Sequence, residues 1–178
     1  MAVSGMLGYG FTEEAFRRGL ELGLDLIACD AGSADPGPYY LGSGTAFVSR
    51  LAVNRDLELM VLGGLEAQVP VIIGSAGGSG SDVQVDWTLE ILAEICAEHG
   101  LSPRVAVVRS EIHRDFLKTK IQNGQTAPLG PIAPLTPDAA DDTDRVVAMI
   151  GVEPFQAALD AGAEIVIAGR SSDAAIYA

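Results

Sequence analysis

The chain has few basic residues, few cysteines and no long apolar run, and each shortage excludes a class of protein. Lys and Arg number 11 against 24 Asp and Glu, which gives a net charge of -13 over 178 residues. Nucleic acids and anionic membranes are bound by clustered basic side chains, so we expect neither as a partner. No apolar run approaches the roughly 18 residues of a membrane span, and the N-terminus lacks the pattern of a secretory signal.

Cysteine and histidine are also scarce, and the spacing of the few present suggests no metal or redox site. Cys29 and Cys96 lie in apolar surroundings without a CxxC or Cys/His spacing, which predicts buried thiols in a reducing compartment. His99 and His113 fall near expected helix ends, and no Ser-His-Asp or Cys-His order stands out. We therefore expect a cytoplasmic protein without a resident cofactor or metal site. CoA as a substrate carrier and a divalent metal remain alternatives.

What the sequence does contain is an alternation of short apolar runs and helical periods. This pattern is typical of an open, mostly parallel, doubly wound α/β sheet with crossover helices. The apolar runs are nearly continuous, as in strands that helices cover on both faces. Strands are expected at residues 24–29, 69–74, 104–108 and 164–168, with a stub at 2–4. Helices are expected at 12–22, 45–62, 85–99, 111–122 and 152–161, with N-caps at Thr12, Thr45 and Ser110 and a stop at Gly100.

Two segments depart from this alternation. In residues 124–142 proline recurs at every third position from Pro128 to Pro137, which favours an extended path. We interpret this segment as an arm or lid, the alternative being an ordered surface loop packed on the body. After the last expected strand the chain barely begins the helix that a parallel crossover requires. The single α/β domain over residues 1–178 is therefore expected to belong to a larger fold or to be completed by a partner chain, unless a short helix closes it.

Similar glycine-rich loops follow three of the expected strands, at residues 29–37, 74–82 and 168–175. Ligands of open α/β sheets bind outside the carboxyl ends of the strands. Glycine allows close backbone approach, and the N-terminus of the next helix adds partial positive charge, so such loops suit carboxylates and phosphates. The loops match neither a P-loop nor the usual dinucleotide fingerprint. Any one of these loops is most simply interpreted as a structural turn. Several such loops at one edge of the sheet, however, favour a ligand-binding site.

The candidate site residues come from these loops. Asp30 directly follows its strand and is the acid expected to have a raised pKa and to act as a general base, with Ser33 and Asp35 as its catalytic neighbours. Arg109 and Arg170 follow strand ends and could clamp a carboxylate or phosphate, or pair with nearby aspartates instead. The other candidates for binding substrate or an anion are Ser75, Gly77, Gly78, Ser79, Asp82, Ser171 and Asp173.

The quoted stretches "SGMLGYGF", "DAGSADPGPYYLGSG", "VIIGSAGGSGSD" and "APLGPIAPLTP" resemble the N-terminal part of the acyclic terpene utilisation (AtuA-like) family. The likeness covers nearly the whole chain, and "DAGSADPGPYYLG" is its most specific part. The resemblance implies a role in the catabolism of branched acyclic terpenoid acids through CoA thioesters, and it implies a longer chain or a partner. It transfers no catalytic residue.

Together these observations predict an intracellular metabolic enzyme subunit that acts on a small carboxylate or acyl-CoA by lyase or hydratase chemistry. One alternative is a noncatalytic subunit that assembles with a partner chain or as a homo-oligomer. The other is a nucleotide- or phosphate-binding protein.

Overall fold

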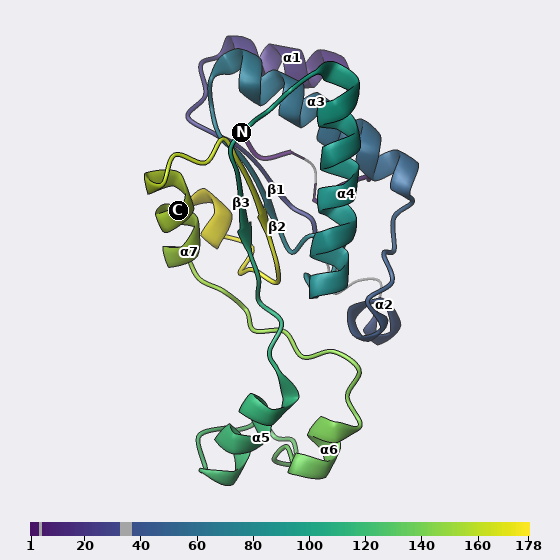
Figure 1. Cartoon of the computed structure of the whole chain (residues 1–178), viewed down its shortest axis with the longest axis vertical. Coiled ribbons are helices and arrows are strands. Elements are labelled where there is room, and N and C mark those ends of the chain that lie inside the picture. Colours follow the sequence, from purple (N-terminus) through teal and green to yellow (C-terminus); the bar gives the residue numbers. More distant parts are fainter. Residues whose placement is uncertain (4, 33–36) are drawn as a thin grey trace.

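A computed structural model describes residues 1–3, 5–32 and 37–178, and it shows an open parallel sheet flanked by helices (Figure 1). Within these residues the strands are β1 (Ile27–Asp30), β2 (Val71–Gly74), β3 (Val105–Val108) and β4 (Ile165–Ala168), in the order β1-β2-β4-β3. The helices are α1 (Glu13–Glu21), α2 (Pro38–Ser43), α3 (Arg50–Ala67), α4 (Asp82–His99), α5 (Arg114–Gln122), α6 (Pro137–Asp141) and α7 (Glu153–Asp160), followed by the 3-10 turn η1 (Ala175–Tyr177). The predicted open, parallel α/β fold is confirmed.

The strands form where the continuous apolar runs predict them. All neighbouring strands are parallel, and the register of β1 with β2 runs from Ile27 opposite Val71 to Asp30 opposite Gly74. The expected stub at the N-terminus makes one isolated parallel bridge, between Ala2 and Ala28. The carboxyl ends of β1, β2 and β4 therefore lie side by side at one edge of the sheet.

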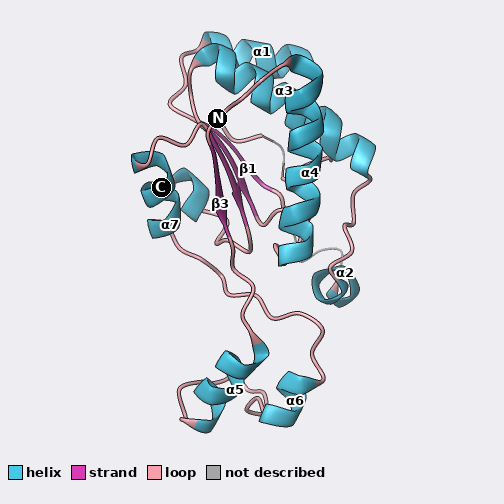
Figure 2. Cartoon of the chain, in the orientation of Figure 1, coloured by secondary structure: helices cyan, strands magenta, loops and turns pink. Residues whose placement is uncertain are grey.

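Helices cover β1, β2 and β4 on both faces, which explains the lack of polar alternation in these three strands. Helices α3 and α4 lie on one face, where α1 packs against α3, and α7 and η1 lie on the other face (Figure 2). The first face buries the larger core, in which Leu57 of α3 and Ile91 of α4 pack on strand residues such as Ile73. On the second face Phe155 of α7 and Ile176 of η1 are almost fully buried. Among the described residues, every helix is too short or too polar to cross a lipid bilayer.

The predicted helix start at Thr45 is wrong. Helix α3 begins at Arg50, and its N-cap is Ser49, whose hydroxyl accepts a hydrogen bond of 3.3 Å from the N–H of Ala52. An unexpected short helix, α2, precedes it and ends at Gly44, which has a left-handed φ of 72°. Since both Ser49 and Thr45 are good capping residues, the choice between them depends on tertiary packing, in which Val48 joins the core.

The predicted cap at Ser110 is also wrong. Helix α5 begins at Arg114 after His113, while Ser110 is buried at the edge of the sheet. Its hydroxyl accepts a hydrogen bond from the N–H of Arg170 and donates one to the carbonyl of Gly80. The hydroxyl thus satisfies backbone groups at the ends of neighbouring segments instead of those of its own helix.

Helices α5 and α6 project from the carboxyl edge of the sheet at the bottom of Figure 1. The chain leaves β3 and returns toward α7 through two segments that are joined by backbone hydrogen bonds, of 2.7 Å from Ile112 to Val146 and 2.8 Å from Ala148 to Ser110. The two helices are tied by an ion pair of 2.6 Å between Lys118 and Asp141. The exposed proline-rich stretch belongs to this projection, and its role as an arm or lid stays a prediction.

Candidate functional site

Three of the glycine-rich loops meet at the carboxyl edge of the sheet, as expected from parallel neighbouring strands. The N–H of Ala31 donates to the carbonyl of Gly74 at 2.8 Å, which joins the loops after β1 and β2. The N–H of Ser75 donates to the carbonyl of Gly169 at 3.0 Å, which joins the loops after β2 and β4. Groups from distant parts of the sequence are thereby brought into one small region.

Asp30 is the acid at the centre of this region. Its side chain is partly buried, and burial raises the pKa of the Asp30 carboxyl above its ordinary value, with a further increase from the charge of Asp173. Hydrogen bonds from the Gly32 N–H, at 3.2 Å, and from the Ser75 side chain oppose the increase, as does the charge of Arg170. A carboxyl with a raised pKa is better suited to accept and return a proton than an ordinary surface aspartate.

Arg170 supplies positive charge next to Asp30. Its guanidinium Nη1 lies 3.5 Å from the carbonyl oxygen of Gly78, so the side chain extends toward the loop after β2. It also lies close to the loop after β1, because a Cβ placed on Gly32 would be 2.8 Å from Nη1. The arrangement places a guanidinium and a carboxyl of raised pKa over the same glycine backbone, a combination that suits an anionic substrate with an acidic proton.

Ser75 and Ser171 connect the loops beneath this pair. Ser75 is buried and has a positive φ of 49°, an unusual conformation for a residue with a side chain, costing about 1–3 kcal/mol. Its hydroxyl accepts a hydrogen bond of 3.1 Å from the N–H of Ser171. The single hydroxyl proton can reach either Asp30 or the carbonyl of Ser171 at 3.4 Å, and the carboxylate is the stronger acceptor. Ser75 therefore couples the loop after β4 to the acid.

Ser79 is part of the internal structure of the loop after β2. Its N–H and its hydroxyl both donate to the Oε1 of Gln84, at 2.8 and 2.5 Å. Gly77, with φ 72°, packs so closely that a Cβ there would lie 2.5 Å from the Cβ of Gln84. Among the described residues, the buried Nε2 of Gln84 and the hydroxyl of Ser81 have no hydrogen-bond partner. These contacts tie the loop after β2 to Gln84 in the first turn of α4.

The N-terminus of α4 is occupied by a carboxylate of the chain itself. Oε2 of Glu111 accepts a hydrogen bond of 2.7 Å from the N–H of Asp82, and its Oε1 accepts one of 3.1 Å from Arg145. A phosphate or carboxylate ligand at this helix end would have to displace Glu111. Sequence reasoning missed this contact because Glu111 was expected inside a helix.

Arg109 lies outside the Asp30 group and pairs with two aspartates of α4. Its Nη2 is 2.5 Å from Oδ1 of Asp86 and its Nη1 is 3.5 Å from Oδ1 of Asp82. The hydrogen bond to Asp86 raises the pKa of the Arg109 guanidinium above its ordinary value. Asp82 also lines, with Glu111 and Arg145, an open groove of about 660 Å³ toward α5 and α6. The structural pairing that the sequence left open for Arg109 is the one observed.

A buried aspartate that the sequence reading overlooked fixes the glycine-rich stretch near the N-terminus. Asp56 of α3 is 1% exposed, and its Oδ2 accepts hydrogen bonds of 2.9 Å from both Gly8 and Gly10. Its Oδ1 forms an ion pair of 2.6 Å with Arg55. A charged residue on the apolar stripe of an expected helix, one position before Leu57, was the signal that could have identified it.

The remaining predicted residues are less constrained. Ser33 and Asp35 lie outside the described residues, so their assignment as catalytic neighbours stays a prediction. Asp173 is exposed and influences Asp30 through its charge, and Gly78 offers its carbonyl to Arg170. The tyrosines of the same stretch pack together, with ring centroids of Tyr39 and Tyr40 5.2 Å apart and those of Tyr40 and Phe47 5.0 Å apart.

An open parallel sheet with an acid, a guanidinium and glycine-rich loops at its carboxyl edge defines an α/β protein with a candidate ligand site of the open-sheet type. Comparison with known families then identifies the particular group. Residues 53–178 match the family described as acyclic terpene utilisation family protein AtuA, and because this is more than half of the chain, the chain belongs to that family. No curated protein and no solved structure matches the chain.

Proposed function

We propose that the chain is a metabolic enzyme subunit that binds a small carboxylate or an acyl-CoA between Asp30 and Arg170 and moves a proton on it. Family membership associates the chain with acyclic terpene utilisation. The observation that carries the proposal is the partly buried carboxyl of Asp30, whose pKa is raised by burial, beside the guanidinium of Arg170. The glycine-rich loops around this pair also carry Asp173, whose charge adds to the increase in the pKa of Asp30.

The chemistry that suits this arrangement is addition or elimination next to an acyl group. Asp30 takes the proton from the carbon adjacent to the carboxylate or thioester carbonyl, and Arg170 stabilises the negative charge that develops on the acyl oxygen. In a hydratase reaction the β-hydroxyl then leaves as water, taking the proton that Asp30 has accepted, so that Asp30 returns to its ionised form. In the reverse direction Asp30 accepts a proton from water as the hydroxyl adds to the β carbon, and it delivers that proton to the carbon adjacent to the carbonyl. CoA enters this proposal as the carrier of the acyl group.

The test is solvent exchange at the substrate carbon. The full chain is incubated in D2O with branched unsaturated carboxylates and their CoA thioesters, and deuterium at the carbon adjacent to the carbonyl is followed by NMR. Asp30→Asn should lower the exchange rate by at least about 100-fold with binding retained, because it removes the base. Arg170→Met should weaken binding by about tenfold or more, since it removes a charge-assisted contact.

Matched controls are Asp25→Asn and Arg18→Met, which alter exposed side chains away from the loops and should leave exchange and binding unchanged. Exchange and binding that survive in both site variants would overturn the proposal. Stabilisation by ATP or NAD in a thermal-shift panel, with no response to carboxylates or thioesters, would favour the nucleotide alternative instead.

A second candidate function, assembly with a partner chain, is favoured by strand β3. This strand lies at the edge of the sheet, and Val105 and Val107 are 39% and 42% exposed although their neighbours Ile165 and Ile167 in β4 are fully buried. Apolar side chains on an edge strand are a common surface for association. Native mass spectrometry tests this candidate: an 18.4 kDa monomer at micromolar concentration would contradict it, and an assembly weakened by Val107→Thr would support it.

A further inference from the structure

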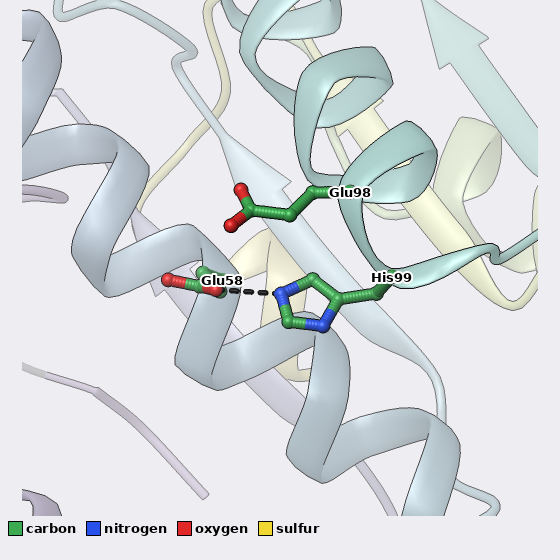
Figure 3. Close-up of side chains that lie close together, drawn as sticks. All are labelled: Glu58, Glu98 and His99. Carbon is green, nitrogen blue, oxygen red and sulfur yellow. Dashed lines mark hydrogen bonds and ion pairs between the residues drawn. The ribbon is translucent and has the colours of Figure 1, made fainter.

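Three potential metal ligands converge at the C-terminal end of α4, at the opposite end of that helix from the Asp30 region (Figure 3). Glu98 and His99 belong to the last turn of α4, and Glu58 reaches them from α3. One ligand atom from each residue lies within 4.8 Å of those of the other two. The Nε2 of His99 is 2.6 Å from Oε1 of Glu58.

The local backbone favours a cation at this position. Helix α4 ends at Gly100, whose φ of 64° turns the chain away, so the last carbonyl groups of the helix point toward this end and carry partial negative charge. Two carboxylates add full negative charges, and in the described part of the chain Glu98 has no salt-bridge partner to neutralise it. A divalent ion would offset both charges.

The three ligands can be reached from solvent, and the packing of α3 on α4 holds them near one another. The side chains of His99 and Glu58 are 31% and 32% exposed, so an ion can reach them from solvent while each is partly held by its surroundings. Helices α3 and α4 pack against each other over the same face of the sheet, which fixes the distance between the two sides of the cluster. The carboxylate of Glu98 is exposed and can rotate toward the other two ligands.

We propose that Glu58, Glu98 and His99 form a binding site for Zn²⁺. The three ligands supply one imidazole nitrogen and two carboxylate oxygens. This mixed nitrogen and oxygen set suits Zn²⁺ better than Mg²⁺ or Ca²⁺, which bind oxygen ligands. On binding, the imidazole of His99 carries its proton on Nδ1, so that the lone pair of Nε2 coordinates the ion in place of the hydrogen bond to Glu58. Three protein ligands leave a fourth position for water. The ion would join α3 to α4. This proposal is independent of the function proposed for the Asp30 region.

The experiment is a Zn²⁺ titration of the full chain, followed by calorimetry and by thermal unfolding. The wild-type chain should bind one equivalent of Zn²⁺, and its Tm should rise by about 5 °C or more at a hundredfold excess over Kd. MgCl2 at the same concentration should leave the Tm unchanged. His99→Gln should abolish the rise, and Glu98→Gln should weaken Zn²⁺ binding by about tenfold.

The chain offers matched controls. His113 is its other histidine and lies exposed beside Asp115, and Cys96 lies one turn before His99. His113→Gln and Cys96→Ser should both keep the wild-type Zn²⁺ response. Loss of that response in either variant, its persistence in His99→Gln, or its absence from the wild-type chain would overturn the proposal. Because Glu98 is exposed, Glu98→Gln tests the site even if His99→Gln does not fold.

Discussion

The buried hydroxyl of Ser110 accepts a hydrogen bond of 2.5 Å from the backbone N–H of Arg170. The same oxygen donates its proton to the carbonyl of Gly80, at 3.3 Å. One side chain from the end of β3 therefore fixes the backbone from which the Arg170 guanidinium extends, and links it to the loop after β2. The position of the candidate anion-binding group depends on this contact between distant segments.

Ser110→Ala should lower the free energy of unfolding by about 1–3 kcal/mol, because it leaves the buried N–H of Arg170 without an acceptor. Urea unfolding monitored by circular dichroism measures the change. Ser102→Ala is the matched control, since Ser102 is exposed, and it should change stability by less than about 0.5 kcal/mol. Equal stability of the two variants would show that the Ser110 hydroxyl does not stabilise this edge.

Gly80→Ala should destabilise the fold by about 3 kcal/mol or more, since its Cβ would meet backbone atoms that cannot move aside. A Cβ at Gly80 would overlap the N of Arg170 and lie 2.5 Å from the carbonyl carbon of Gly169. Gly23→Ala is the control: Gly23 has a similar φ of 76° but no atom within 4 Å of its Cβ position. It should cost only about 1 kcal/mol from backbone strain. Chemical unfolding of both variants separates the effect of close contact from that of backbone strain. If Gly80→Ala lost no more free energy of unfolding than Gly23→Ala, the close contact at Gly80 would be refuted.

Asp56→Ala should cost about 3 kcal/mol or more, because it removes a buried acceptor from the N–H groups of Gly8 and Gly10 and a charge from Arg55. Hydrogen exchange should also become faster at the amides of Gly8 and Gly10 than in the wild-type chain. The exposed Asp25→Ala serves as the control and should affect neither measurement. Unchanged protection of both glycine amides would contradict the role given to Asp56.

Asp30 should make stability depend on pH in the direction opposite to that of a salt-bridged carboxylate. Because the pKa of Asp30 is raised on folding, the folded state binds its proton more tightly than the unfolded state does. Its contribution is therefore most favourable below about pH 4, the ordinary range of an unfolded aspartate, and declines as pH rises through the raised folded value.

Asp30→Asn removes this decline, so the variant should gain stability relative to wild type as pH rises from about 4, and the gain should level off above the folded pKa. Urea midpoints measured between pH 4 and pH 8 follow the difference. Asp30→Glu keeps an ionisable group and should retain a decline. A constant difference between Asp30→Asn and wild type over the whole range would exclude a raised pKa.

Local signals predicted most of the elements. Thr12 does cap α1, its hydroxyl accepting from Ala15, and Gly100 does end α4 in a left-handed conformation. The continuous apolar runs located β1, β2 and β4, which helices cover on both faces, and they also located β3, although Val105 and Val107 of that strand are partly exposed. By contrast, nothing near Ser110 or Glu111 in sequence indicates that their partners are Arg170 and the N-terminus of α4. Contacts of this kind depend on the order of the strands, which periodicity does not encode.

For the candidate site, the sequence predicted which residues lie at the edge of the sheet but not where their side chains point. Parallel strands place their carboxyl ends together, so Asp30 and Arg170 could be expected at one edge from their places after strands. That Arg170 turns toward Gly78 while Arg109 turns away to Asp86 follows from packing between loops. The ligand cluster at Glu58 and His99 also joins residues 41 positions apart, and it becomes visible only once α3 and α4 are placed side by side.

The position of β4 has a consequence for how the chain is made. Among the described residues it follows the other three strands in sequence, yet it lies between β2 and β3 and pairs with both. A nascent chain on the ribosome therefore cannot unite its earlier strands into one sheet until residues 165–168 have emerged. Until then β2 and β3 keep open, apolar edges of the kind that chaperones bind and that aggregate when left exposed. Synthesis of β4 joins β2 to β3 and removes that risk between them.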